Sequence, residues 1–451
     1  MSHKLLMPSR SLMSPKSLKQ SFPQFPLPAG YQTHILTNGL KIIHQYANSA
    51  AAHCGLTIGV GSRDEQQGEN GMSHFIEHVL FKGTQKRKAF HVLSRLEDVG
   101  GELNAYTTKE DTCIYASFLP KDYERAIELF SDIVFHSEFP EKEIVKEKEV
   151  VIDEINSYKD TPSELIFDDF EELIFENDAI GRNILGDEAV VRSFTREQVL
   201  NFVRVHYKPQ QMVISSIGNI DFEKLVRLVE RYFGNVSRSG DLSLPNKGET
   251  VWGGEKRASF CRQPPKLYIP RNKRVTMETH QTHCAMGSRA YGFDDDRRIP
   301  LSLLTELLGG SGMTSRLNLN IREKHGLVYN IEAGCNSYTD TGVFTIYFGC
   351  DATNLQRCMR LCKNELKSLY VKPLGNGQLK KLKAQTLARM ALSLENYENM
   401  MLTIGKSFIV FDKVDSIKEL VQKVEDIDAK LLQEIAAEIF DVERLSVLVF
   451  E

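Results

Sequence analysis

Three side chains that could bind a metal ion and use it lie within five residues of one another, in the stretch GMSHFIEHVLFKGT (residues 71–84). His74 and His78 are four residues apart, and Glu77 lies between them. The apolar residues of this stretch recur at helical spacing, which predicts a helix. Because residues four apart lie on one face of a helix, both imidazoles can reach the same ion.

These residue types favour zinc. Neutral imidazole nitrogens bind Zn2+ at about 2.0–2.1 Å, and a neighbouring carboxylate such as Glu77 can hold a water on the ion. We expect Ser73 to cap the start of the helix and Gly83 to end it. The alternative is that two buried histidines and a surface glutamate share this spacing by chance, which a chain of 12 histidines allows. A zinc site therefore requires a third ligand elsewhere in the chain.

A second helix is predicted over residues 142–158, where apolar residues recur without a helix breaker. Glu147 and Glu154 are seven residues apart on it. That spacing is two helical turns, so both carboxylates lie on one face and can point at the same partner. Without the two histidines, these glutamates would be interpreted as part of a solvated charged face.

The segment HFIEH, from His74 to His78, has the inverted zinc-peptidase pattern H-x-x-E-H. On this pattern the chain resembles the M16 metallopeptidases, which include the beta subunit of mitochondrial processing peptidase and bacterial M16B peptidases. That family takes its third ligand from a glutamate about 75 residues after the second histidine, and Glu154 lies at that distance from His78. The resemblance therefore implies that Glu154 is the third ligand and that Glu147 supports the site from the same helix face.

The resemblance also implies a strand that binds substrate. In M16 enzymes the corresponding strand lies at a sheet edge beside the metal, and an extended substrate pairs with it through main-chain hydrogen bonds. The alternative is an ordinary strand paired on both sides. The residues concerned are Asn104, Ala105, Tyr106 and Thr107.

A third feature lies in the second half of the chain. The sequence REKHGLVY, from Arg322 to Tyr329, resembles the family signature R-E-K-x-G-L-x-Y. The resemblance implies that this arginine and tyrosine face the substrate backbone and the developing oxyanion. A fixed cation and a phenol donor suit a negatively charged tetrahedral intermediate. Taken alone, they would be interpreted as a surface charge and a half-buried core aromatic.

The chain of 451 residues is long enough for two domains. We predict a flexible N-terminal segment over 1–30, a catalytic zinc domain over 31–235, a linker over 236–264 and a C-terminal domain over 265–451. The second half repeats sequence features of the first, which indicates an internal duplication. The predicted fold class is α+β, with two homologous domains that each pack helices on a mostly antiparallel sheet.

The C-terminal copy is predicted to lack the metal site. Its segment 302–309 (SLLTELLG) falls where the zinc helix would be. In that alignment Ser302 replaces His74 and Glu306 replaces His78. We therefore expect the second domain to contribute substrate-binding residues and no metal ligands.

Composition excludes several other classes of protein. The net charge of −4 and pI near 6.3 provide no basic field for nucleic acid. No apolar stretch approaches 18 residues, so no membrane span is expected. The eight cysteines form no CxxC pair, which favours free thiols in a reducing compartment. Residues 1–30 contain no acidic residue, which suits either a flexible leader in a bacterial cytoplasmic protein or a transit peptide for the mitochondrial matrix.

The resemblance covers the chain from about Tyr31 to the C-terminus and implies a zinc endopeptidase. His74, His78 and Glu154 would hold the ion and leave one position for water. Glu77 would take a proton from that water and return it to the leaving amine. The alternatives are a non-catalytic subunit of this fold, which normally lacks a ligand or the base, and a zinc hydrolase of small molecules. All motif positions are intact, which favours the endopeptidase.

We also expect a dimer. In M16 relatives of double length, the zinc domain and the Arg/Tyr domain that completes its site lie in opposite halves. This chain has half that length and carries both features. The economical arrangement is a two-fold homodimer around a peptide chamber, in which each zinc site receives Arg322 and Tyr329 of the partner subunit. A heterodimer with a related subunit is the alternative.

Overall fold

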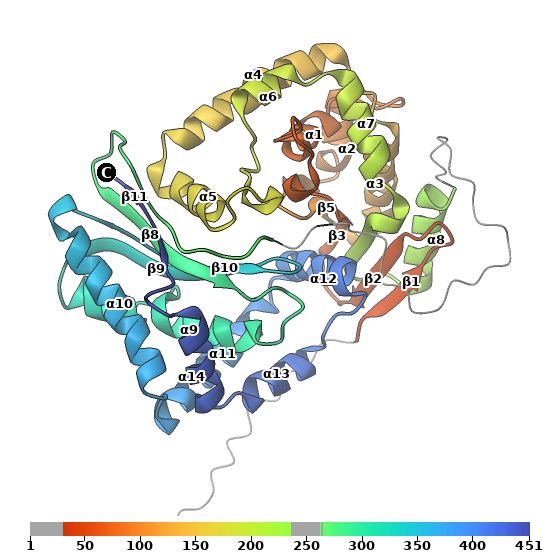
Figure 1. The fold of residues 1–451 in the computed structure, drawn as a ribbon. Helices are drawn as coiled ribbons and strands as arrows, with labels where there is room; N and C mark the ends of the chain where they lie inside the picture. The colour runs from red at the N-terminus through yellow and green to blue at the C-terminus, as the bar shows by residue number, and fades with distance from the viewer. Residues whose placement is uncertain (1–29, 236–261, 263–264) are drawn as a thin grey trace, which may run out of the picture.

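The structure is a computed structural model that describes residues 30–235, 262 and 265–451. The predicted N-terminal segment and linker lie almost entirely outside these residues. The described chain forms two units, each with helices packed on a sheet (Figure 1). Their cores contain most of the large buried side chains. No helix within the described residues is long and apolar enough to span a bilayer.

The first sheet has six strands in the order β1-β2-β6-β3-β5-β4. β6 is buried along its whole length and β3 nearly so, which matches their apolar sequences and central positions. β4 forms one edge of the sheet. The bounds are β1 (Gln32–Ile35), β2 (Lys41–Tyr46), β3 (Ala52–Ile58), β4 (Glu102–Thr107), β5 (Thr112–Phe118) and β6 (Met212–Gly218).

The second sheet has five strands in the order β7-β11-β8-β10-β9. It repeats the topology of the first sheet without a counterpart of β1. The pairs β2–β6 and β7–β11 are parallel, and the other described pairs are antiparallel. The predicted class of two homologous, mostly antiparallel units is therefore confirmed. The bounds are β7 (Asn272–Val275), β8 (Thr282–Ala290), β9 (Val328–Ser337), β10 (Gly342–Cys350) and β11 (Ser446–Phe450).

The helices follow the strands in the same order in both halves. α1 follows β3 and α9 follows β8, so α9 is the counterpart of the predicted zinc helix. By the same order, α4 corresponds to α11 and α5 to α12. In the first half the helices are α1 (Met72–Leu80), α2 (Ala89–Glu97), α3 (Tyr123–His136), α4 (Glu141–Lys159), α5 (Pro162–Ile174), α6 (Glu188–Ser193), α7 (Arg196–His206) and α8 (Phe222–Phe233). In the second half they are α9 (Arg298–Gly309), α10 (Leu355–Val371), α11 (Asn376–Ser393), α12 (Tyr397–Phe411), α13 (Ile417–Asp426) and α14 (Ala429–Ile439).

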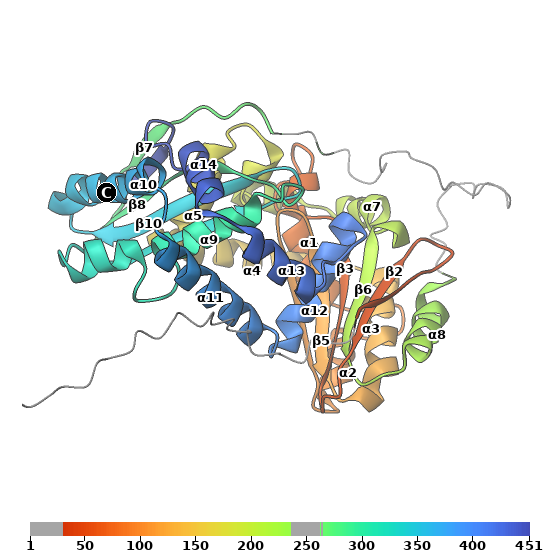
Figure 2. The same ribbon diagram turned by 90° about the horizontal axis from the view of Figure 1, so that it is seen from below.

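Each half supplies one helix to the sheet of the other half. α5 packs on the second sheet, where Phe170 shares a buried apolar cluster with Leu448. α12 packs on the first sheet, and Figure 2 shows it beside those strands. This contact is close, because a Cβ on Gly405 would lie 2.8 Å from the Ser215 hydroxyl. The exchange explains why the two units form one body, which the sequence pattern did not indicate.

Charged groups reinforce the junction between the halves. The guanidinium of Arg63 donates to both carboxylate oxygens of Asp340, at 2.7 and 2.8 Å, and to Glu110 at 2.6 Å. The three charged groups come from segments far apart in the sequence. Bidentate pairs of this kind are directional, so they orient the two units as well as joining them.

Candidate metal centre

The candidate zinc helix α1 begins two positions earlier than the sequence suggested. Gly71 occupies the N-cap with φ +91°, and Ser73 lies inside the first turn, so the predicted Ser73 cap is wrong. The carboxylate of Glu65 instead accepts hydrogen bonds from the amides of Gly71 and Ser73. The predicted stop at Gly83 is also wrong, because the helix ends at Leu80 and the chain then turns.

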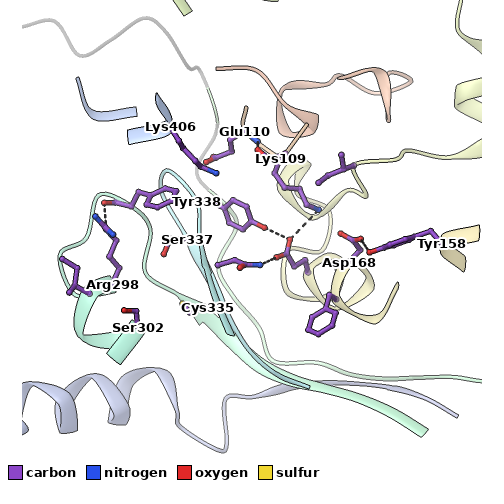
Figure 3. Close-up of a pocket in the computed structure, with 17 residues that line it drawn as sticks. Lys109, Glu110, Tyr158, Asp168, Arg298, Ser302, Cys335, Ser337, Tyr338 and Lys406 are labelled. Carbon is purple, nitrogen blue, oxygen red and sulfur yellow. Dashed lines mark hydrogen bonds and ion pairs between the residues drawn. The ribbon is translucent and has the colours of Figure 1, made fainter. Parts of the chain in front are cut away.

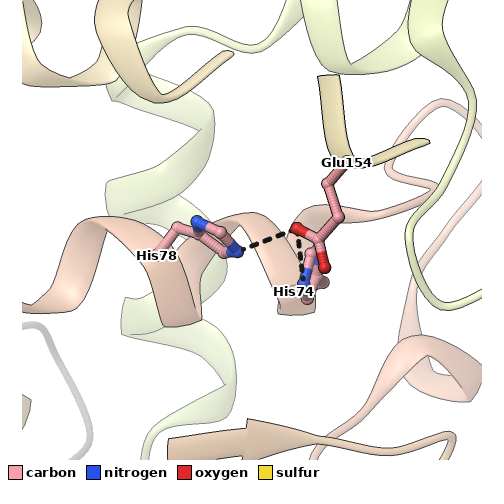
Figure 4. Close-up of side chains that lie close together, drawn as sticks. All are labelled: His74, His78 and Glu154. Carbon is pink, nitrogen blue, oxygen red and sulfur yellow. Dashed lines mark ion pairs between the residues drawn. The ribbon is translucent and has the colours of Figure 1, made fainter. Parts of the chain in front are cut away.

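His74, His78 and Glu154 are brought together at one point between α1 and α4 (Figure 4). Oε2 of Glu154 lies 3.7 Å from Nε2 of His74 and 3.3 Å from Nε2 of His78. One ligand atom from each residue lies within 4.8 Å of the other two. Two ligands at about 2.0–2.1 Å from a tetrahedral ion are roughly 3.3 Å apart, so this spacing fits one zinc ion.

Electrostatics keep these groups in forms that can bind a cation. Burial, followed by the neighbouring His78, lowers the pKa of His74 to about 4, so this imidazole is neutral at neutral pH. The hydrogen bond from His78 lowers the pKa of Glu154, so it is ionised. Burial acts to lower the pKa of His78, but Glu154 and Glu147 raise it. Glu154 and Glu147 stabilise the protonated form of His78, and a cation bound between these groups would take the place of that proton.

Glu77 lies beside the three candidate ligands. It forms no hydrogen bond with any of these three residues. Burial raises the pKa of its carboxyl, and the nearby Thr107 hydroxyl opposes this shift. Its Oε2 is buried and has no hydrogen-bond partner among the described residues. A carboxylate with a free oxygen can accept a proton, and a raised pKa makes it a stronger proton acceptor.

Glu147 joins the candidate metal site to a lysine that sequence reasoning did not select. Its Oε2 lies 3.4 Å from Nδ1 of His78, and its Oε1 lies 2.7 Å from Nζ of Lys82. The carboxylate thus contacts the imidazole nitrogen that faces away from Glu154. Lys82 lies two residues beyond the end of α1, so helical spacing does not place it and the contact is a feature of the tertiary structure.

The predicted substrate strand is β4, and its position at the sheet edge agrees with the prediction. Among the described strands β4 pairs with β5 alone, so one row of its main-chain groups faces away from the sheet. Asn104 is exposed, while Ala105, Tyr106 and Thr107 are half-buried. Thr107 lies near Glu77, so the C-terminal end of β4 approaches the candidate site.

Arg322 and Tyr329 lie together but in a different place from the candidate zinc ligands. Cζ of Arg322 is 6.0 Å from the centre of the Tyr329 ring, and Tyr329 is 81% exposed. They line a cavity of about 550 Å3, and none of the three candidate ligands lines it. His283 and Tyr347 also line this cavity and share a hydrogen bond of 2.9 Å. Sequence reasoning missed that pair, since only the sheet register brings the two residues together.

A larger cavity of about 640 Å3 lies between the two halves (Figure 3). Tyr338 of the second half donates across the junction to Glu171 of the first half at 2.6 Å. Lys109, also of the first half, forms an ion pair with the same carboxylate. Ser302, the counterpart of His74 in the predicted alignment, lines this cavity. Within the described residues, the cluster that could hold a metal ion is the one formed by His74, His78 and Glu154, and none of these residues lines this cavity.

The fold and the site together define a class of enzyme, the metallopeptidases in which one helix carries H-x-x-E-H and a later helix supplies a glutamate. Two family models match the chain: "Insulinase (Peptidase family M16)" over residues 41–188 and "Peptidase M16 inactive domain" over residues 193–386. The chain belongs to the M16 family of zinc metallopeptidases.

Curated relatives support this assignment over nearly the whole chain. An uncharacterized zinc protease of Streptomyces coelicolor is 31% identical over 405 residues, covering 90% of this chain and 86% of the relative. The uncharacterized zinc protease YmxG of Bacillus subtilis is 31% identical over 404 residues, with 89% and 94% covered. A third, from Rickettsia bellii, is 31% identical over 417 residues, with 92% and 96% covered.

Solved structures share the fold. A protease from Helicobacter pylori superposes with a TM-score of 0.84 at 20% identity, covering 94% of this chain and 100% of that one. The M16 inactive domain from Pseudomonas fluorescens superposes with a TM-score of 0.83 at 16% identity, covering 94% of this chain and 98% of that one.

The seven described cysteines are free, as predicted, and Cys261 lies outside the described residues.

Proposed function

We propose that this chain is a zinc endopeptidase that hydrolyses peptides or unfolded polypeptide segments bound as an added strand in an enclosed chamber. The observation that carries the proposal is the position of Glu77, buried beside three clustered ligand side chains and near the end of an edge strand. His74, His78 and Glu154 would hold the ion. When bound, zinc supplies Lewis acidity for a water and for a peptide carbonyl.

The residues of the chain account for the remaining steps. Glu77 accepts a proton at its carboxylate and delivers it to the nitrogen of the leaving amine. Glu147 orients His78 through Nδ1. The free main-chain groups of β4 align an extended substrate through hydrogen bonds that do not depend on its side chains.

The substrate contacts from Arg322 and Tyr329 come from the partner subunit in this proposal. Their cavity is separate from the zinc ligands of their own chain, which supports a composite site in a two-fold homodimer. A heterodimer with a related subunit would meet the same requirement. These relatives are bacterial, and the location proposed for this chain is the bacterial cytoplasm, with the mitochondrial matrix as the alternative.

Zinc analysis and peptide digestion test this proposal together. The purified chain is expected to contain one zinc per chain and to cleave unstructured peptides from a mixed library, with products mapped by mass. Removal of zinc by a chelator should abolish cleavage, and zinc should restore it. A metal-loaded protein that hydrolyses small-molecule esters or amides but no peptide would refute the endopeptidase. Absence of any hydrolysis would favour the non-catalytic subunit.

A further inference from the structure

The first turn of the zinc helix is held by a buried carboxylate from outside the helix. Glu65 is 4% exposed. Its Oε2 accepts from the amide of Gly71 at 2.9 Å, and its Oε1 accepts from the amide of Ser73 at 2.8 Å. Both donors are amides that a helix start leaves without an intrahelical partner. His74, a candidate zinc ligand, is the next residue after Ser73.

The N-cap position itself cannot supply this contact. Gly71 has φ +91°, and a Cβ built on it would lie 2.6 Å from the carbonyl oxygen of Leu185. A capping serine or aspartate at this position would therefore be strained and would clash with the chain. The capping group must come from another segment, and Glu65 meets that need.

A loop outside the predicted site motifs holds Glu65 in place. Nη1 of Arg182 donates to the main-chain oxygen of Glu65 at 2.7 Å. The carbonyl of Arg182 in turn accepts from Nζ of Lys109 at 2.6 Å. Lys109 lies just beyond the end of β4. The contacts therefore run from the substrate edge strand through Arg182 and Glu65 to the zinc helix.

We propose that Glu65 is a positioning residue that sets the orientation of the first turn of α1, and with it His74, relative to the edge strand. This inference rests on the proposed function in that His74 is taken as a zinc ligand. Rotation or fraying of the first turn would move His74 while leaving His78, one turn further on, in place. The expected consequence is weaker zinc binding and slower turnover with little change in substrate binding.

Glu65→Gln is the principal test, because it keeps the size of the side chain and replaces one acceptor oxygen with an NH2 group that faces a donor. Glu69→Gln is the matched control: Glu69 lies in the same loop and also accepts a main-chain amide, that of Gln66 at 2.9 Å. Four quantities are measured for each protein: the zinc dissociation constant by chelator competition, kcat and KM for a peptide, and the melting temperature without metal.

Glu65→Gln should raise the zinc dissociation constant by about 10–100-fold and lower kcat, with KM within about twofold of wild type. The cobalt-substituted protein should show an altered visible absorption spectrum, and hydrogen exchange should be faster in the peptide that contains Gly71 and Ser73. Glu69→Gln should resemble wild type in all of these. If Glu65→Gln does not fold, Glu65→Asp, which shortens the reach by one methylene, is expected to change the same quantities in the same direction.

A folded Glu65 variant with wild-type zinc affinity and an unchanged cobalt spectrum would overturn the proposal. The proposal would also be overturned by a variant that binds zinc normally once folded and whose loss of activity matches its lower melting temperature without metal. These readouts are independent of catalysis. A wild-type protein that binds zinc but cleaves no peptide would refute the proposed function and leave the role of Glu65 still measurable.

Discussion

Glu306 on α9 forms an ion pair with Arg389 on α11. In the first half, the corresponding helices α1 and α4 carry His78 and Glu154 side by side. The C-terminal copy thus joins its two equivalent helices by a salt bridge where the N-terminal copy places candidate zinc ligands. The ion pair therefore keeps a polar contact between the two equivalent helices.

Substitution of Arg389 should therefore affect stability and leave the metal site unchanged. Both partners are partly exposed, so Arg389→Gln is expected to cost only about 1 kcal/mol of the free energy of unfolding. Denaturant unfolding of the zinc-loaded protein measures this loss, and zinc content should equal that of wild type. A fall in zinc content would mean that the second half supports the metal site directly.

Substitution of Glu77 should separate metal binding from chemistry. Glu77→Gln retains the three ligands but cannot accept a proton, so it should keep zinc and lose nearly all turnover. His74→Ala and Glu154→Gln should lose zinc as well as activity. Metal analysis and peptide cleavage on the same preparations distinguish the two outcomes. Cleavage by Glu77→Gln at the wild-type rate would exclude Glu77 as the base.

Glu147 should control zinc affinity through His78. Its carboxylate contacts Nδ1 of His78 and is itself held by Lys82. Glu147→Gln is expected to weaken zinc binding by about 10–100-fold, as measured by chelator competition. Glu143→Gln on the same helix is the control, because its ion pair with Lys146 is remote from the ligands. Equal zinc affinity in the two variants would show that Glu147 has no role in zinc binding.

Mixed dimers should test the composite site. Glu77→Gln and Arg322→Ala should each be nearly inactive alone. After co-refolding, half the dimers are mixed and each has one complete site of two, so activity should recover to about a quarter of wild type. If Arg322 instead serves the zinc site of its own chain, no combination contains a complete site and the mixture stays inactive.

Acid should destabilise the first domain through His44. This residue is fully buried on β2, and burial lowers its pKa from 6.5 to about 4, against weaker opposing effects of Ile220, Ser216 and Asp221. The unfolded chain then binds a proton that the folded chain does not, so stability falls as the pH drops from 6.5 towards 4. Between pH 7 and pH 4, the free energy of unfolding of wild type should fall by about 3 kcal/mol more than that of His44→Gln. Unfolding of both zinc-loaded proteins at each pH measures the difference. Parallel pH profiles would show that His44 does not titrate as described.

Local patterns predicted the helices and strands that carry the site. The spacing of His74 and His78, and that of Glu147 and Glu154, places each pair on one helix face, because helical geometry depends only on neighbouring residues. The family resemblance then selected Glu154, and the structure places its carboxylate beside both imidazoles. The resemblance implied the α+β class, and sequence features repeated in the second half indicated the internal duplication.

Contacts between distant segments were beyond the sequence alone. Ser73 is a good capping residue by type, yet packing of Gly71 against Leu185 moves the N-cap and gives the capping role to Glu65. The exchange of α5 and α12 between the sheets depends on how the two units dock. The sequence by itself therefore determined which residues could bind zinc and accept a proton. Only the tertiary structure decided which of them meet, because burial and long-range packing choose among many local arrangements of similar free energy.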